Sequence, residues 1–240
     1  MILYVNALSD VGLVRKDNED NYLVSPERGL FVVADGMGGH VGGQVASTLA
    51  IQIVDESITP AQLETFQPDY LLLQALEKAN TEIYSRGKQE QYYGMGTTVT
   101  AALFHGEQVY VAHIGDSRAY LLRDKELTLL TQDHSLVNEL FQSGSLTLEE
   151  AQNHPQRHVL TRALGTEEKP QIDIFSTAVQ PGDLLVLCTD GLYNHVPEGD
   201  ILNVILETNF DLKLAVNNLV NLALERGGND NITVALVQYE

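Results

Sequence analysis

The stretch VVADGMGGHVGG, at residues 32–43, places five glycines in eight positions directly after an apolar run. The run is typical of a buried strand, and the glycines open the backbone just after Asp35. Val45, Leu49 and Ile53 then recur at a spacing of four residues, which predicts a helix. Such glycines can cradle a phosphate, let a metal ion lie close to the main chain, or make a turn. The residues of this stretch alone leave all three uses open.

The patterns on either side predict an α+β fold, with helices covering antiparallel sheets. Strands are expected at 2–8, 22–25, 30–34, several within 97–130, 172–175, 183–188 and 232–237. Two further helices are expected through Leu72, Leu76, Ala79 and Ile83, and through Leu212, Val216, Leu219 and Ala223. Residues 133–165 are more polar, and we interpret them as an inserted flap subdomain. No linker rich in Pro, Gly or Ser divides the chain, so residues 1–240 are expected to form one domain.

The charge composition argues against two classes of partner, nucleic acid and anionic membranes. The chain has 33 acidic and 14 basic residues, a formal charge of −19, which disfavours nucleic acid and anionic membranes. We find no apolar stretch long enough to span a bilayer and no signal peptide. Cys188 is the one cysteine and lies in an apolar run, so we expect it to be buried, in a cytoplasmic protein.

Five aspartates lie at or near the ends of predicted strands. Asp35, Asp116 and Asp190 follow apolar runs, Asp230 precedes the last strand, and Asp20 precedes an early one. Each alone fits an ordinary turn. If the strand ends share one edge of a sheet, however, the clustered carboxylates would be costly without cations. Ligation by oxygen alone favours Mg²⁺ or Mn²⁺ over zinc.

Three competing motifs fail on the letters. The dinucleotide pattern needs a glycine where Val41 stands, and no Gly-Lys-Ser/Thr completes a P-loop. A calcium-binding EF-hand loop starting at Asp17 would have Tyr22 at its required glycine and Arg28 at its required glutamate.

Eight segments, taken in order, resemble the metal-dependent protein phosphatase 2C family in its compact bacterial form. They are RKDNED (15–20), ADGMGGH (34–40), GTT (96–98), GDSR (115–118), DHS (133–135), HPQRHVLTRALG (154–165), TDGL (189–192) and GGNDNIT (227–233). Each is weak by itself, but the series spans nearly the whole chain in the expected order.

The resemblance implies a central β-sandwich flanked by helices, with metal ions at one end, and hydrolysis of phosphoserine and phosphothreonine in proteins. Two core Mn²⁺ or Mg²⁺ ions and a weaker third one are implied, and they would activate water without a covalent intermediate. Of the implied ligands, Asp35 would bridge the two core ions, with the Gly36 carbonyl as a further ligand. Asp190 and Asp230 would complete the first core ion, and Asp20 would support the second core ion. Asp116 and Asp190 would share the third, weaker ion. Arg15 would bind the substrate phosphate, and Tyr193-Asn-His, where members vary, affects no implied ligand.

Some alternatives stay open. His40 is our candidate general acid, and it has an equal claim to a packing or water-binding role. His113, in an alternating strand, is expected to be structural, whereas His154 and His158 in the flap are either structural or face the substrate. A catalytically silent binding protein, or a hydrolase of small phosphate esters, would fit the same fold. We expect a monomer whose partners are phosphorylated proteins.

Overall fold

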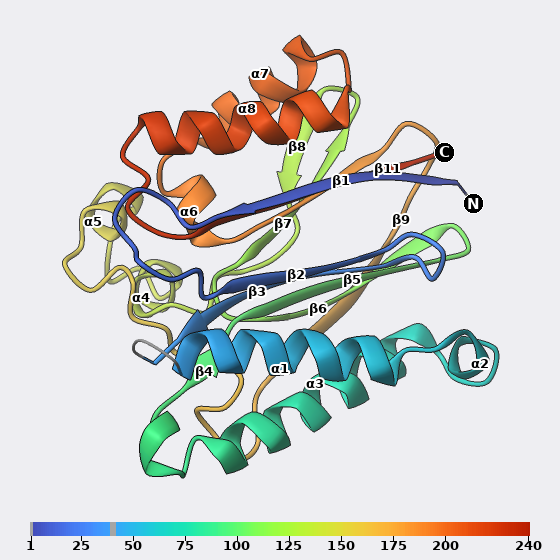
Figure 1. Cartoon of the computed structure of the whole chain (residues 1–240). Helices are drawn as coiled ribbons and strands as arrows, with labels where there is room; N and C mark the ends of the chain where they lie inside the picture. The colour runs from blue at the N-terminus through green and yellow to red at the C-terminus, as the bar shows by residue number, and fades with distance from the viewer. Residues whose placement is uncertain (1, 39–41) are drawn as a thin grey trace.

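Two antiparallel sheets lie face to face in the computed structural model, with helices outside each of them (Figure 1). The structure describes residues 2–38 and 42–240. The first sheet has the strand order β1–β11–β10–β7–β8 and the second β2–β3–β5–β6–β9, with β4 paired to β3. The predicted fold class, an α+β sandwich with helices on both sides, is confirmed.

The strands of the first sheet are β1 (Leu3–Asp10), β7 (Arg118–Arg123), β8 (Glu126–Leu129), β10 (Leu184–Cys188) and β11 (Ile232–Tyr239). Those of the second are β2 (Asp20–Ser25), β3 (Leu30–Met37), β4 (Gly96–Thr97), β5 (Val99–His105), β6 (Gln108–Ile114) and β9 (Asp173–Ala178). The predicted strands agree with these to within a few residues. A turn at Gly106, which has a positive φ of 63°, joins β5 to β6.

Helices α1 (Gly42–Ser57) and α3 (Pro68–Arg86) cover the second sheet, and α7 (Glu198–Glu207) and α8 (Leu212–Glu225) cover the first (Figure 1). Short helices complete the fold: α2 (Pro60–Leu63), α4 (Leu136–Gln142), α5 (Leu148–Gln152), α6 (Asp190–Tyr193) and a 3₁₀ turn, η1 (Glu90–Tyr92). None of the helices described is both long and apolar enough to cross a membrane.

Apolar burial explains this layering. Leu72, Leu76, Ala79 and Ile83, the residues that predicted α3, are all fully buried against the second sheet. In α1 the most deeply buried side chains are Ala46, Ala50 and Val54. Each of them comes one residue after a member of the series that predicted the helix, Val45, Leu49 and Ile53. Small alanines let α1 lie close to β3, while Val45 and Leu49 pack at the margin of the contact.

Two features differ from the expectation. Asp35 does not end its strand, since β3 continues to Met37 and pairs Gly36 with Thr97. Helix α7 was not predicted, although Ile201 and Ile205 are spaced for one buried face and are fully buried. Pro197 stands immediately before this helix, and proline is common at helix starts.

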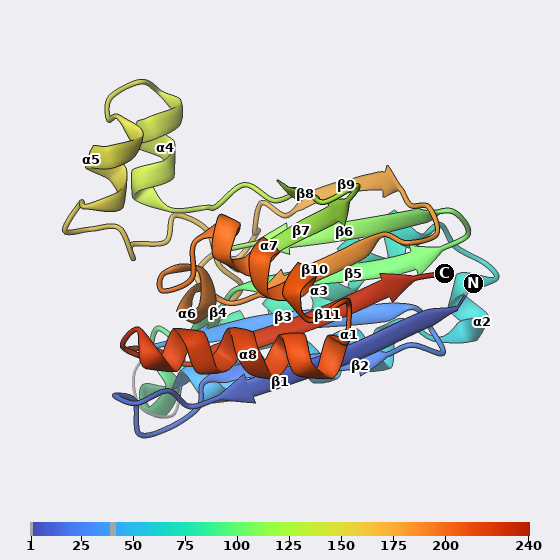
Figure 2. The same ribbon diagram turned by 90° about the horizontal axis from the view of Figure 1, so that it is seen from above.

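The segment 133–165 carries α4 and α5 and projects from one end of the sandwich (Figure 2). Its two ends are tied together, because Ser135 pairs with Leu160 and the amide of Thr161 donates to the His134 carbonyl at 2.9 Å. A capping box formed by Thr147 and Glu150 starts α5. The segment therefore forms a unit with a narrow base beside the strand ends.

Candidate active site

The five predicted aspartates lie near one end of the sandwich. Asp20 begins β2 and pairs with Asp35 on β3, whereas Asp116 follows β6 and Asp190 follows β10. Burial raises the pKa of Asp35 well above its ordinary value, and the charges of the four other aspartates raise it further. The sandwich thus brings together the carboxylates that the sequence scatters over more than 200 residues.

Asp20 is buried, and only one of its carboxylate oxygens has a partner. Its Oδ2 accepts hydrogen bonds from the hydroxyls of Thr189 at 2.7 Å and Thr233 at 2.6 Å. Its Oδ1 is buried with no hydrogen-bond partner. Burial, opposed by these two hydrogen bonds and helped by the nearby Asp190 and Asp230, raises the pKa of Asp20 to about 7. A buried oxygen left in this condition is costly unless a ligand completes it.

Asp190 repeats this arrangement. Its Oδ1 is also buried without a partner, and its Oδ2 accepts a hydrogen bond from the Asn194 amide at 3.1 Å. The Nδ1 atom of His158, from the flap, lies 3.9 Å from the same Oδ2. The Asp190 carboxylate is therefore oriented by Asn194, the residue that follows α6, and one carboxylate oxygen is left without a partner.

Gly36 is required by a close backbone approach. A Cβ at this position would lie 2.1 Å from the carbonyl oxygen of Gly43, at the start of α1. The Gly36 amide donates to the Glu19 carbonyl, and Asp35 is held on both sides by Thr97 and Thr98. We expected glycine here so that its carbonyl would be accessible, and the packing of α1 on β3 is a second reason for it.

Arg15 lies on the loop before β2, where its Nη2 forms an ion pair with Asp230 Oδ2 at 2.7 Å. The Arg15 side chain is 51% exposed, so it can leave Asp230 for another anion at little cost. Asn231 holds this loop in place, since its Nδ2 donates to the carbonyls of Val11 and Asp17 and its Oδ1 accepts from the Glu19 amide.

Asp116 occupies a tight turn between β6 and β7. Gly115 has a φ of 108°, and a Cβ there would lie 2.5 Å from the Thr98 side chain. Burial and the charge of Asp190 raise the pKa of Asp116 well above its ordinary value. The turn is buried, and it places Asp116 near enough to Asp190 for their charges to interact.

The carboxylate cluster offers oxygen ligands of the kind that divalent metal ions prefer. Within residues 2–38 and 42–240, no three His, Cys, Asp or Glu side chains are arranged closely enough to hold a single ion by themselves. Hard divalent ions, however, are commonly completed by water and backbone carbonyls. The unpartnered buried oxygens of Asp20 and Asp190 are donors of the right type, so the residues fit ions that divide the aspartates between them.

The sequence matches the family model "Protein phosphatase 2C" over residues 9–222. The chain belongs to the protein phosphatase 2C family. It is 41% identical over 239 residues to the serine/threonine phosphatase stp of Listeria monocytogenes serotype 4b (strain F2365), covering 97% of this chain and 94% of that protein. It is 39% identical over 239 residues to the protein phosphatase PhpP of Streptococcus pneumoniae serotype 2 (strain D39 / NCTC 7466), covering 97% and 96%.

Solved structures of the same family share the fold. The serine/threonine phosphatase PstP/Ppp of Mycobacterium tuberculosis superposes with a TM-score of 0.92 at 38% identity, covering 100% of both chains. A catalytic domain of PstP in complex with two manganese ions gives a TM-score of 0.88 at 37% identity, covering 99% of this chain and 98% of that one. The predicted family is confirmed, and the predicted activity agrees with the names of these phosphatases.

The family's histidine motifs lie in different settings. His40 falls outside the described residues. His113 is fully buried, facing the Thr100 hydroxyl at 2.9 Å and the Gln132 carbonyl at 3.1 Å, which supports the structural role expected for it. His154 Nδ1 accepts from the Gln156 amide within the flap, while His158 reaches Asp190.

Sequence reasoning missed the residues that support the aspartates. Thr189 and Thr233 bind Asp20, Asn194 orients Asp190, and Asn231 ties the Arg15 loop to the loop before β11. Thr189, Asn231 and Thr233 do stand within the quoted TDGL and GGNDNIT segments, so their place beside the aspartates was a usable signal. Cys188 is buried in β10 as predicted.

Proposed function

We propose that this protein is a metal-dependent phosphatase that hydrolyses phosphoserine and phosphothreonine in proteins. The observation that carries the proposal is the pair of buried, unpartnered oxygens on Asp20 and Asp190, at one end of a protein phosphatase 2C fold. The manganese ions of the similar PstP catalytic domain support Mn²⁺ or Mg²⁺ as the cofactor here.

The residues divide into those that hold ions and those that bind substrate. We assign Asp35, the Gly36 carbonyl, Asp190 and Asp230 to the first core ion, with Asp35 shared and Asp20 supporting the second. Asp116, with Asp190, would hold a weaker third ion. When bound, two such ions supply a water molecule of lowered pKa and offset negative charge on the phosphoryl oxygens.

Arg15 would bind two oxygens of the substrate phosphate once it leaves Asp230, because a guanidinium group can donate to both at once. We assign proton donation to the leaving serine or threonine oxygen to His40, with packing or water binding as its alternative role. Cys188 takes no part, since burial raises the pKa of its thiol to about 12. No protein nucleophile is needed, so no covalent phosphoenzyme forms.

The decisive experiment measures turnover of a phosphothreonine peptide and of p-nitrophenyl phosphate with Mn²⁺, with Mg²⁺ and with excess EDTA. We expect hydrolysis of both esters with either ion and none in EDTA. Absence of metal-dependent turnover on both would instead favour a silent binding protein. Turnover of p-nitrophenyl phosphate alone would favour a hydrolase of small esters.

The biological setting is part of the same proposal. The substrates would be proteins phosphorylated by serine/threonine kinases, and the enzyme would act as a monomer in the cytoplasm. One cysteine, buried and unpaired, suits a reducing compartment. Light scattering on the purified protein tests the monomer, since a mass near twice 26.4 kDa would exclude it.

A further inference from the structure

Two residues that follow the Asp190-Gly-Leu motif contact the two aspartates assigned to the third ion. Tyr193 ends α6, and its hydroxyl donates to the backbone carbonyl of Asp116 at 3.0 Å. Asn194 comes next, and the Nδ2 atom of its side chain donates a hydrogen bond to Asp190 Oδ2 at 3.1 Å. Their spacing along the chain did not connect these two side chains with the implied ligands.

The Tyr193 ring is fixed by its neighbours. The guanidinium carbon of Arg118 lies 3.7 Å from the ring centroid, a cation–π contact. Arg118 is itself held by two parallel hydrogen bonds to Asp133, of 2.9 and 2.7 Å, and by a third to the Tyr120 hydroxyl at 3.0 Å. With the ring held in this way, the Tyr193 hydroxyl has a defined position beside Asp116.

The turn that carries Asp116 is gripped from two sides. On one side the His134 amide donates to the Gly115 carbonyl at 2.8 Å, and the Gly115 amide donates to His134 Nδ1 at 3.1 Å. On the other side, Tyr193 binds the next carbonyl along, that of Asp116. The second contact connects the Asp116 backbone directly to the helix that begins with Asp190.

Asn194 acts on the other aspartate. By binding Oδ2 of Asp190 it sets the rotation of the carboxylate, and the buried Oδ1 is the oxygen left without a partner. One short segment, Tyr193-Asn194, thereby sets both the backbone at Asp116 and the carboxylate plane of Asp190. Supporting contacts of this kind govern how well ligands hold a metal ion.

We propose that Tyr193 and Asn194 are positioning residues for the third divalent cation, and that they set its affinity relative to the two core ions. This inference rests on the proposed function, because it presumes ions at the carboxylate cluster. The segment would therefore set the affinity of this chain for the third ion without any change to an aspartate.

The test is calorimetric titration of EDTA-stripped protein with MnCl₂, comparing wild type with Tyr193→Phe. The change removes one hydroxyl and keeps the ring on Arg118. Tyr239→Phe is the matched control, since the Tyr239 hydroxyl donates to the Gly106 carbonyl and its ring stacks on Phe104 far from the aspartates. We expect Tyr193→Phe to weaken the weakest Mn²⁺ site about three- to tenfold, the effect of one neutral hydrogen bond, and to leave the tighter sites unchanged.

Asn194→Ala provides a second variant at an exposed position, where folding is not at risk. We expect it to weaken the third site by a similar factor, with a smaller effect on the core site that shares Asp190. Thermal melting of all variants in EDTA separates folding from metal binding. If Tyr193→Phe weakens all sites equally, or matches Tyr239→Phe, the inference is wrong. If wild type binds two ions and no third, the inference fails while the proposed function stands, and if it binds none, the proposed function fails.

Discussion

Two aspartates lie on either side of strand β10, and they differ in how completely they are paired. Asp183, just before the strand, accepts hydrogen bonds from Arg123 Nε at 2.9 Å, from Arg123 Nη2 at 2.6 Å and from the Gln180 amide at 2.9 Å. Asp190, two residues after the strand, has a buried oxygen with no partner. Because native proteins pair nearly all buried polar atoms, an exception needs an explanation, and at Asp190 the explanation that we propose is a bound metal ion.

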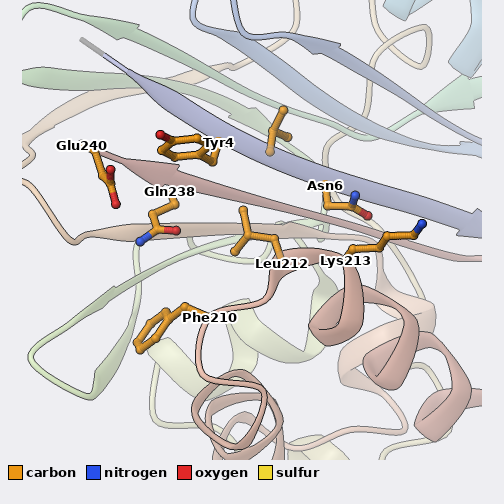
Figure 3. A pocket seen from close by; sticks show the side chains of 8 residues that line it. Tyr4, Asn6, Phe210, Leu212, Lys213, Gln238 and Glu240 are labelled. Carbon is orange, nitrogen blue, oxygen red and sulfur yellow. The ribbon is translucent and has the colours of Figure 1, made fainter.

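The two aspartates lie at opposite ends of the sandwich, and the surface near Asp183 carries a groove. Beside Asp183, β1 and β11 run past the start of α8, and a groove of about 420 Å³ lies there (Figure 3). Tyr4, Phe210 and Leu212 line it, with Lys213 beside them. It is roughly 20 Å from the carboxylate end, at about 3.3 Å per residue along β1. This groove thus lies at the end where the buried aspartate is fully paired, so a hollow in the surface does not by itself locate the active site here.

Replacing Asp190 and Asp183 in turn by alanine should give the largest difference in catalytic activity. Asp190→Ala should lower kcat/KM on the order of 10³-fold, because metal stabilisation of transition-state charge is worth several kcal/mol. It should leave the melting temperature in EDTA unchanged or higher, since it relieves repulsion among the carboxylates. Steady-state kinetics with Mn²⁺ and thermal melts measure the two effects.

Asp183→Ala is the control for this first prediction. It should cost about 2–4 kcal/mol of folding free energy, because Arg123 loses a nearly buried partner. The folded fraction should keep the kcat/KM of wild type within about twofold. If Asp183→Ala abolished activity in protein shown to be folded, our assignment of a structural role to Asp183 and a catalytic role to Asp190 would be wrong.

In the metal-free protein, stability should fall as pH rises. Asp20 has a pKa of about 7 when folded, against about 3.9 in an unfolded chain. A raised folded pKa means that the stabilisation is complete below pH ~4 and is lost as pH rises through ~7, by on the order of a few kcal/mol. Chemical unfolding in EDTA from pH 4 to pH 8 measures the slope.

Two comparisons check the cause of this slope. Asp20→Asn should flatten it, because the amide does not ionise. Saturating Mn²⁺ should raise stability at pH 8, by about 2.7 kcal/mol at a concentration 100 times Kd. A metal-free protein that became more stable toward pH 8 would show that burial and the neighbouring aspartates do not raise the pKa of Asp20 as we describe.

The sequence predicted most of the strands and the long helices α1, α3 and α8 because each carries its own periodicity, but α7 was missed. It also predicted which aspartates would come together, since their motifs are local. It did not predict that the Thr233 hydroxyl binds Asp20, 213 residues earlier, because spacing along a chain does not say which side chains meet. For the same reason, the pairing of Arg15 with Asp230 and the contact of Tyr193 with Asp116 required the three-dimensional fold.

The ion pairs Arg15–Asp230 and Arg123–Asp183 also compare a proposed catalytic residue with a structural one, and the expected effects are smaller. Arg15→Ala should raise KM about tenfold with little change in kcat, because it removes a phosphate contact made in both the ground and transition states. Its melting temperature should hardly change, since an ion pair this exposed is worth at most about 1 kcal/mol. Arg15→Lys should restore only part of the loss, because lysine lacks the two-pronged geometry.

Arg123→Ala is the matched control, and the opposite pattern is expected for it. Its partner Asp183 has a side chain only 3% exposed, so the variant should melt at a lower temperature with an unchanged KM. An unchanged KM for Arg15→Ala would remove Arg15 from the substrate site.

The smallest effect should come from the groove of Figure 3. Tyr4 and Phe210 are 51% and 36% exposed, so the double variant Tyr4→Ser, Phe210→Ser removes apolar surface while burying no new polar atom. We expect kcat/KM for a phosphothreonine peptide to stay within about twofold of wild type, as for most surface changes. A loss of about tenfold or more for a phosphoprotein, with none for p-nitrophenyl phosphate, would mean that the groove holds the substrate chain. In that case the two ends would cooperate, one binding the protein and the other its phosphate, and the pairing state of a buried aspartate would locate the chemistry but not the whole recognition surface.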